Sequence, residues 1–103
     1  KRIGICLDIG HSFRCNHNPS DMLARFADRV VDMHIKDVTE QKPDGISTGI
    51  GRGIINFPEL IRTMQKINYQ GFCSLEYERP GDPAMGIAES LGYFRGVQRA
   101  IEG

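Results

Sequence analysis

Three residues that can bind a metal ion stand at the ends of three strand-like stretches of this 103-residue chain. They are Asp8, His34 and Glu76, which end the stretches 3–8, 31–34 and 72–76. Because side chains alternate between the two faces of a strand, each points away from the hydrophobic residue just before it. Two carboxylates and an imidazole on one face form a ligand set for a divalent cation. We therefore expect a metal-centred active site, or part of one.

Glu76 is the strongest single candidate, because an ionised carboxylate within a strand is costly unless a cation or partner compensates it. His34 lies between two apolar residues, so its ring needs a hydrogen bond or a metal ion, and a satisfied core histidine is the alternative. Gly10 lets the chain turn after Asp8 and brings His11 beside the carboxylate. We expect Asp8 and His11 to contact metal or substrate. Alternatively, Asp8 only caps the turn and His11 is solvated.

Further polar residues follow His34 and Glu76. Lys36 shares the face of His34 and is expected to neutralise a substrate oxygen or to pair with a carboxylate. Asp37 is expected to orient the following loop or a metal ligand. Glu78 shares the face of Glu76 but lies farther out, at the rim.

Residues 39–55 form a polar, glycine-rich stretch that is longer than most connections in a compact domain, and such loops are often functional lids. The run 49–53 fails the dinucleotide-binding fingerprint, because it does not connect a strand directly to a helix. We interpret it as a flap whose Arg52 faces solvent or an anionic substrate. His17 has no strand context and is interpreted as a surface residue.

Helices are expected between the strands. Asn18 followed by Pro19 starts one over about 19–28, and Asn56 caps another that ends near Asn68. A third begins at 82–83 and continues with an apolar stripe. Alternating strands and helices predict an α/β fold with parallel strands and right-handed crossovers.

Composition excludes some classes of function. The 13 basic and 13 acidic side chains balance, so there is no electrostatic footprint for nucleic acid or an anionic membrane. No apolar run is long enough to span a bilayer and no signal-peptide pattern is present, so we expect a cytoplasmic protein. The three cysteines lack a C-x-x-C spacing. We interpret Cys6 and Cys73 as small core residues and Cys15 as a loop thiol.

Over nearly its whole length, the chain resembles the xylose-isomerase-like TIM-barrel superfamily of sugar isomerases, epimerases and dehydratases, which shares its fold with apurinic-site endonucleases. The resemblance is carried by four motifs, in residues 7–11, 31–37, 51–57 and 71–76. It implies that residues 1–103 are the sixth to eighth strand-helix units of a (β/α)8 barrel. It also implies that Asp8, His34 and Glu76 are metal ligands and that His11 contacts the substrate.

The chain departs from the family pattern at two positions and lacks the upstream part of the barrel. The family usually has Gly-Glu-Gly where Arg52 stands between glycines, and often Asp in place of Asn56. A metal-binding glutamate from an upstream strand is not in this chain, nor are the first strand-helix units. The chain begins without Met in a strand, so we expect the interior of a longer protein. Three strands cannot close a barrel, and we expect self-association or pairing with the upstream portion.

The resemblance implies a metal-dependent sugar isomerase or epimerase that transfers a proton next to a carbonyl, with a small sugar or polyol as substrate. In this scheme Glu76 is ligand and base, His11 holds a substrate oxygen, and the metal is Mn, Mg, Co or Zn. We expect the isolated chain to be inactive. The alternatives are a polyol dehydratase of the same fold, an apurinic-site endonuclease, and a fragment with a purely structural role. The neutral charge and a loop without histidine disfavour the endonuclease.

Overall fold

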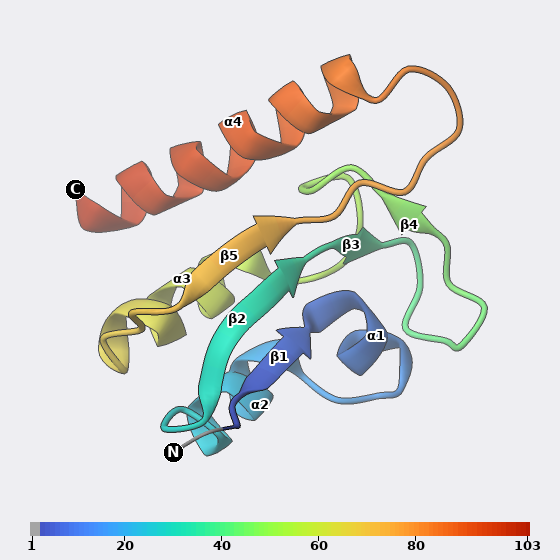
Figure 1. Ribbon diagram of the computed structural model, residues 1–103. Helices are drawn as coiled ribbons and strands as arrows, with labels where there is room; N and C mark the ends of the chain where they lie inside the picture. The colour runs from blue at the N-terminus through green and yellow to red at the C-terminus, as the bar shows by residue number, and fades with distance from the viewer. Residues whose placement is uncertain (1–2) are drawn as a thin grey trace.

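A computed structural model describes residues 3–103, in which strands alternate with helices over most of the chain (Figure 1). The strands are β1 Ile5–Asp8, β2 Val30–Ile35, β3 Asp37–Val38, β4 Ser47–Thr48 and β5 Phe72–Leu75. The helices are α1 Ile9–Arg14, α2 Pro19–Arg25, α3 Phe57–Lys66 and α4 Ala84–Glu102.

The main sheet has the strand order β1-β2-β5, and both pairs of strands are parallel. Helices α2 and α3 lie behind this sheet, and α4 runs beside β5 (Figure 1). The short β3 and β4 form a separate antiparallel pair beyond the C-terminal end of β2. The predicted α/β class and parallel strands are therefore confirmed, and the carboxyl ends of three strands lie at one edge.

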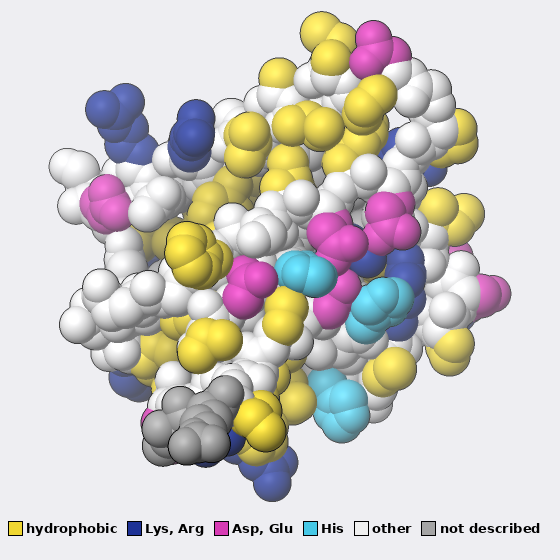
Figure 2. Space-filling view, viewed as in Figure 1, with side chains coloured by type: hydrophobic (Ala, Val, Ile, Leu, Met, Phe, Trp, Pro, Cys, Tyr) yellow, Lys and Arg dark blue, Asp and Glu magenta, His cyan; other side chains and the backbone are white. Residues whose placement is uncertain are grey.

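The sheet has one buried face and one open face. Leu7 and Met33 point to the buried face, where they join a core that includes Leu23, Phe57 and Leu60 from the helices. The neighbouring residues of each strand point to the opposite face because of the two-residue period. That open face carries polar side chains, and in a space-filling view acidic side chains and histidines gather there (Figure 2).

The assignment of Cys6 and Cys73 to the core is wrong, because both thiols are exposed. Cys6 lies on the open face, opposite Leu7. Cys73 aligns with Met33 on the buried side but belongs to the edge strand. A cavity of about 200 Å³ separates β5 from α4 there, and Cys73 lines it together with Phe94.

Two predicted helix starts are confirmed by their caps. The side chain of Asn18 accepts hydrogen bonds from the backbone N–H of Ser20 at 2.8 Å and of Asp21 at 3.2 Å. The side chain of Asn56 accepts from the N–H of Glu59 at 3.0 Å. Helix α2 stops at Arg25, three residues before its predicted end at 28, and a turn follows. Asn68 has a φ of 53°, which is the left-handed stop expected after α3.

Helix α1 was not expected, because six residues are too few to show a hydrophobic period. Asp8 is the N-cap of this helix, and its Oδ1 accepts a hydrogen bond from the backbone N–H of His11 at 2.9 Å. The capping role that was an alternative for Asp8 is therefore real. One carboxylate oxygen caps the helix, and the other is directed to the neighbouring side chains described below.

Helix α4 follows Asp82, whose carboxylate accepts from the N–H of Ala84 at 3.0 Å. Its apolar stripe is only half-buried, and Leu91 is 37% exposed. Phe57 of α3 anchors it through edge-to-face contacts with Tyr93 and Phe94, with ring centroids 6.1 and 6.3 Å apart. Within residues 3–103, none of the helices combines the length and apolarity that a bilayer span requires.

Candidate active site

Asp8, His34 and Glu76 meet on the open face, at the C-terminal ends of the three parallel strands. One ligand atom from each lies within 4.8 Å of the others. Nδ1 of His34 is 3.9 Å from Oδ2 of Asp8 and contacts Oε1 of Glu76. The structure therefore brings together the three residues that the strand pattern singled out.

The strand register explains why these side chains converge. Asp8 is the direct neighbour of His34 across the β1–β2 pair. Glu76 follows β5 by one residue, and its N–H still bonds the carbonyl of Ile35 at 3.0 Å. Ser74 is the neighbour of His34 in the β2–β5 pair, so Glu76 lies two residues farther along the strand, on the same face. Its longer side chain reaches back to the imidazole.

The donor set and its surroundings fit a divalent cation. Oε1 of Glu76 is buried, and it faces Nδ1 of His34 without a well-formed hydrogen bond from any residue in 3–103. A buried carboxylate oxygen against a ring nitrogen needs a proton or a cation between the two atoms, and a divalent cation bound by both meets that need. Two carboxylates with one imidazole suit Mn, Mg, Co or Zn and leave room for water, substrate or a ligand from elsewhere.

Lys36 and Glu78 extend the charged cluster toward its rim. The side chain of Lys36 is 2% exposed, and its Nζ lies 3.5 Å from Oδ2 of Asp8 and pairs with Glu78. Burial lowers the pKa of Lys36, but the hydrogen bond to Glu78 and the nearby Asp8 carboxylate outweigh it, so the pKa is raised. Burial acts to raise the pKa of Asp8, yet the His11 N–H and Lys36 lower it overall. Both groups are therefore charged at neutral pH, as a carboxylate ligand requires.

His11 stands at the exposed edge of this cluster. Its Nε2 is 3.7 Å from Oδ2 of Asp8, and its side chain is 64% exposed. The imidazole is thus free to reach a small molecule bound over the strand ends. Its contact with substrate stays a prediction.

Asp37 is buried and organises the loop that follows β4. Its carboxylate accepts hydrogen bonds from the backbone N–H groups of Gly51 at 3.0 Å, Gly53 at 2.9 Å and Ile55 at 3.2 Å. A Cβ at Gly53 would lie 2.3 Å from Oδ1 of Asp37, so only glycine allows this approach. The structure supports the loop-orienting interpretation of Asp37, which contacts backbone rather than the ligand cluster.

Arg52 lies in the loop after β4, and its side chain contacts helix α4. Its guanidinium pairs with Glu89, with Nη2 at 2.9 Å from Oε2, and its side chain is 67% exposed. Ile50 N–H also bonds Oγ of Ser90 at 3.1 Å, which holds the same loop against α4. Arg52 thus makes a structural ion pair, and a role in substrate binding stays a prediction.

Two residues near His34 were missed as site residues, Asp32 and Cys6. Oδ2 of Asp32 is 3.9 Å from Nε2 of His34, and the thiol of Cys6 donates to the same oxygen at 3.8 Å. The signal was present, because Asp32 precedes His34 by two residues and Cys6 precedes Asp8 by two. Strand alternation therefore puts all four on one face. Slight burial and the Asp32 carboxylate raise the pKa of the Cys6 thiol, so it is protonated at neutral pH.

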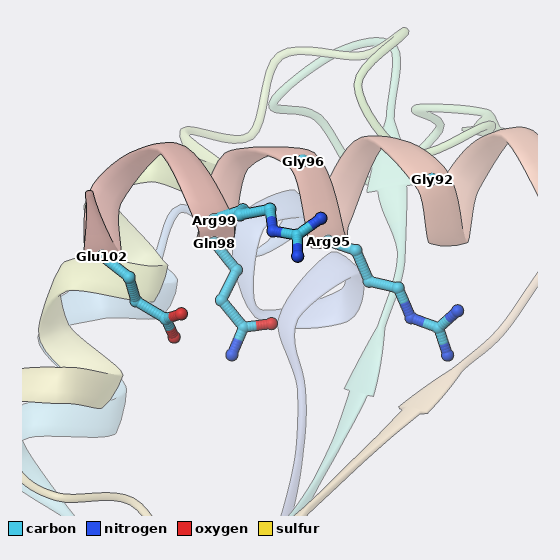
Figure 3. A pocket seen from close by; sticks show the side chains of 6 residues that line it. All are labelled: Gly92, Arg95, Gly96, Gln98, Arg99 and Glu102. Atoms are coloured by element: carbon cyan, nitrogen blue, oxygen red, sulfur yellow. The ribbon is translucent and has the colours of Figure 1, made fainter.

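The candidate site is an open cluster on the sheet and is separate from a hollow of about 440 Å³ along α4. Arg95, Gln98, Arg99 and Glu102 line that hollow together with Gly92 and Gly96 (Figure 3). None of the residues that ring the α4 hollow belongs to the ligand cluster at the strand ends. The chemistry is therefore to be sought on the sheet.

Parallel strands with covering helices, and ligands gathered at the carboxyl ends of the strands, define part of a (β/α)-barrel. A family described as xylose isomerase-like TIM barrel matches residues 1–97. The chain belongs to this family, and its fold is a partial TIM barrel. The expected superfamily and fold class are therefore confirmed.

The curated relatives include a rhizopine catabolism protein and several inosose dehydratases, all from bacteria. The chain is 28% identical to the rhizopine catabolism protein MocC of Rhizobium meliloti, over 82% of this chain and 30% of that protein. It is also 28% identical to an inosose dehydratase of Lacticaseibacillus casei, over 81% of this chain and 32% of that protein. The chain spans about a third of the length of the curated relatives it matches.

Two solved structures show the same arrangement. A xylose isomerase domain protein from Planctomyces limnophilus superposes with a TM-score of 0.80 at 25% identity, covering 96% of this chain and 39% of that chain. A xylose isomerase domain protein from Alicyclobacillus acidocaldarius superposes with a TM-score of 0.73 at 20% identity, covering 97% of this chain and 38% of that chain. The second likeness bears on the fold alone.

Proposed function

We propose that this chain supplies part of the metal-dependent active site of an enzyme that removes water from a polyol-derived ketone of the inosose type. The observation that carries the proposal is the convergence of Asp8, His34 and Glu76 within 4.8 Å. Relatives that are inosose dehydratases support the substrate class and favour dehydration over the isomerisation expected from the sequence. The role is proposed for a longer barrel in which residues 1–103 are the sixth to eighth units.

In the proposed reaction, Glu76 takes the proton from the carbon next to the substrate carbonyl. The electron pair of that C–H bond forms a double bond to the next carbon, away from the carbonyl. The hydroxyl on that next carbon takes up a proton and leaves as water. A divalent cation held by Asp8, His34 and Glu76 would act as a Lewis acid on substrate oxygens. His11 donates a hydrogen bond to a substrate oxygen from the exposed edge. Lys36 keeps Asp8 ionised and adds positive charge beside the oxygens.

The proton donor for the departing hydroxyl is proposed to come from the upstream part of the barrel. The open edges of β1 and β5 are proposed to pair with that part, because Ile3 just before β1 and Phe72 at the start of β5 are 74% and 77% exposed. This chain alone is then expected to bind a metal ion weakly and to catalyse no turnover.

The test uses the full-length protein that contains this chain, an inosose as substrate and mass spectrometry of the product. A product lighter by one water, formed at a rate that falls about 100-fold or more in Glu76→Gln, supports the proposal. Glu102→Gln at the end of α4 is the matched control and leaves the rate unchanged. Activity that persists within a few-fold in Glu76→Gln would contradict the proposed role.

Isomerisation or epimerisation is the second candidate, and the solved neighbour from Planctomyces limnophilus, named as a xylose isomerase domain protein, favours it. The same residues serve it, because proton removal next to a carbonyl begins both reactions. In that case the proton returns to a neighbouring carbon, or to the same carbon from the other face. The product then has the mass of the substrate, so the same measurement separates the two candidates.

A further inference from the structure

A second group of ligand atoms lies on the open face, one residue pair below the candidate active site. It is made by Cys6, Asp32 and the other ring nitrogen of His34, all within 4.8 Å of one another. Oδ2 of Asp32 is central, at 3.8 Å from Sγ of Cys6 and 3.9 Å from Nε2 of His34. The ligand atoms of each of the two clusters therefore lie within 4.8 Å of one another.

The backbone of the sheet fixes the relative positions of these ligands. Cys6 and Asp32 are direct neighbours in the β1–β2 register, and His34 follows Asp32 by two residues on the same face. Ser74 of β5 donates its hydroxyl to Oδ1 of Asp32 at 3.3 Å, which leaves Oδ2 facing the thiol and the imidazole. The three ligand atoms already lie within 4.8 Å of one another, on strands whose register the sheet fixes.

We propose that Cys6, Asp32 and Nε2 of His34 form a second cation site that takes a thiophilic divalent ion such as Zn²⁺. A thiolate, a carboxylate and an imidazole are a zinc ligand set, with a fourth tetrahedral position for water. The ion replaces the thiol proton of Cys6, which passes to solvent. The first cluster offers only oxygen and nitrogen atoms, so it also accepts harder ions such as Mn²⁺ or Mg²⁺, which a thiolate site binds poorly.

The two sites share one imidazole, and this makes them exclusive. A neutral imidazole carries one lone pair and one N–H. When Nε2 binds an ion, Nδ1 carries the proton and faces Glu76 and Asp8, which orient the ring as carboxylates do behind zinc-bound histidines. When Nδ1 binds an ion, Nε2 carries the proton and faces Asp32. The chain therefore holds one ion at a time, and the softness of the ion selects the site.

The test titrates the full-length protein that contains this chain with Co²⁺, which reports a thiolate ligand by a charge-transfer band in the near ultraviolet. We expect the band in the wild type at one ion per chain. We expect its loss in Cys6→Ser and binding about tenfold or more weaker in Asp32→Asn. Cys15→Ser and Cys73→Ser are the matched controls and keep the band. Circular dichroism of each variant checks that the sheet is intact.

Mn²⁺ binding, followed by electron paramagnetic resonance, separates this proposal from the proposed function. Cys6→Ser should leave Mn²⁺ affinity unchanged, whereas Glu76→Gln should weaken it and keep the Co²⁺ band. Added Zn²⁺ should displace Mn²⁺ from the wild type at a lower concentration than from Cys6→Ser, because only the wild type also offers the thiolate site. A wild type without the band, a band that persists in Cys6→Ser, or Zn²⁺ and Mn²⁺ bound together would overturn the second site. A band without Mn²⁺ binding would support it and count against the proposed function alone.

Discussion

The two faces of the β1-β2-β5 sheet come from the same three strands, but one is buried and apolar and the other is open and polar. On one face Leu7 and Met33 are 6% and 0% exposed and pack against α2 and α3. On the other, Asp8, His34 and Glu76 gather their polar atoms at an open surface. The buried face therefore stabilises the fold, and it also fixes the positions of the strands that carry the ligand side chains of the polar face.

The largest effect is expected from truncating the buried side. Phe57→Ala removes a fully buried ring that anchors α4 through Tyr93 and Phe94, and we expect the free energy of unfolding to fall by about 3–5 kcal/mol. Phe72→Ala is the matched control, because Phe72 is 77% exposed, and its effect should stay within about 0.5 kcal/mol. Urea denaturation measures both. An equal loss of unfolding free energy in the two variants would contradict the view that the buried face provides the stability.

A substitution on the polar face is expected to weaken metal binding strongly and to change stability little. His34→Ala removes the nitrogen that both ligand clusters share, so binding of Mn²⁺ and of Co²⁺ should each weaken more than about 100-fold. Without metal, its unfolding midpoint in urea should stay close to that of the wild type, since His34 is 38% exposed at the side chain. Isothermal titration calorimetry measures the binding. A variant that unfolds before metal is added would show that the polar face also holds the fold together.

Asp37 lies in β3, outside the main sheet, and its substitution is expected to have an intermediate effect. Asp37→Ala leaves the N–H groups of Gly51, Gly53 and Ile55 without their acceptor, and we expect a loss of about 1–3 kcal/mol. Hydrogen exchange of these three amides should become faster. Asp37→Asn keeps one acceptor oxygen and should show a smaller change. Unchanged exchange in Asp37→Ala would mean that β3 and β4 hold the loop by themselves.

The smallest effect is expected at the ion pair that ties this loop to α4. The hydrogen bond from Arg52 lowers the pKa of Glu89. A lowered folded-state pKa contributes stability above the unfolded value, and this contribution is lost as the pH falls through the folded value. The difference in urea midpoint between wild type and Glu89→Gln should therefore shrink from neutral pH to below the usual glutamate range near 4.3. A difference that is independent of pH would contradict this account.

Much of the fold follows from local signals. Asn18 and Asn56 cap helices where expected, and the parallel strands appear at the expected stretches. Asn56 stands where the family often has Asp, and its amide oxygen accepts the same type of capping bond. The short helix α1 escaped notice, because one turn and a half of helix leaves no periodic pattern.

The candidate site was predictable for one physical reason, the two-residue period of a strand. Applied to Asp8, His34 and Glu76, it placed all three on one face without any knowledge of distance. The same rule also includes Cys6 and Asp32, but Cys6 was assigned to the core as a small residue inside a predicted strand. Which face a helix covers is a tertiary property, and it is why Cys6 is exposed.

The residues of this chain alone determined the strand-helix alternation, the helix caps and the set of side chains that share a face, because each depends on neighbours within a few positions. Only the tertiary structure decided that Arg52 pairs with Glu89, that Asp37 binds the loop backbone and that each nitrogen of His34 faces a different carboxylate group. These contacts join positions far apart in the chain. They depend on strand register and helix packing, which set distances that no local spacing contains.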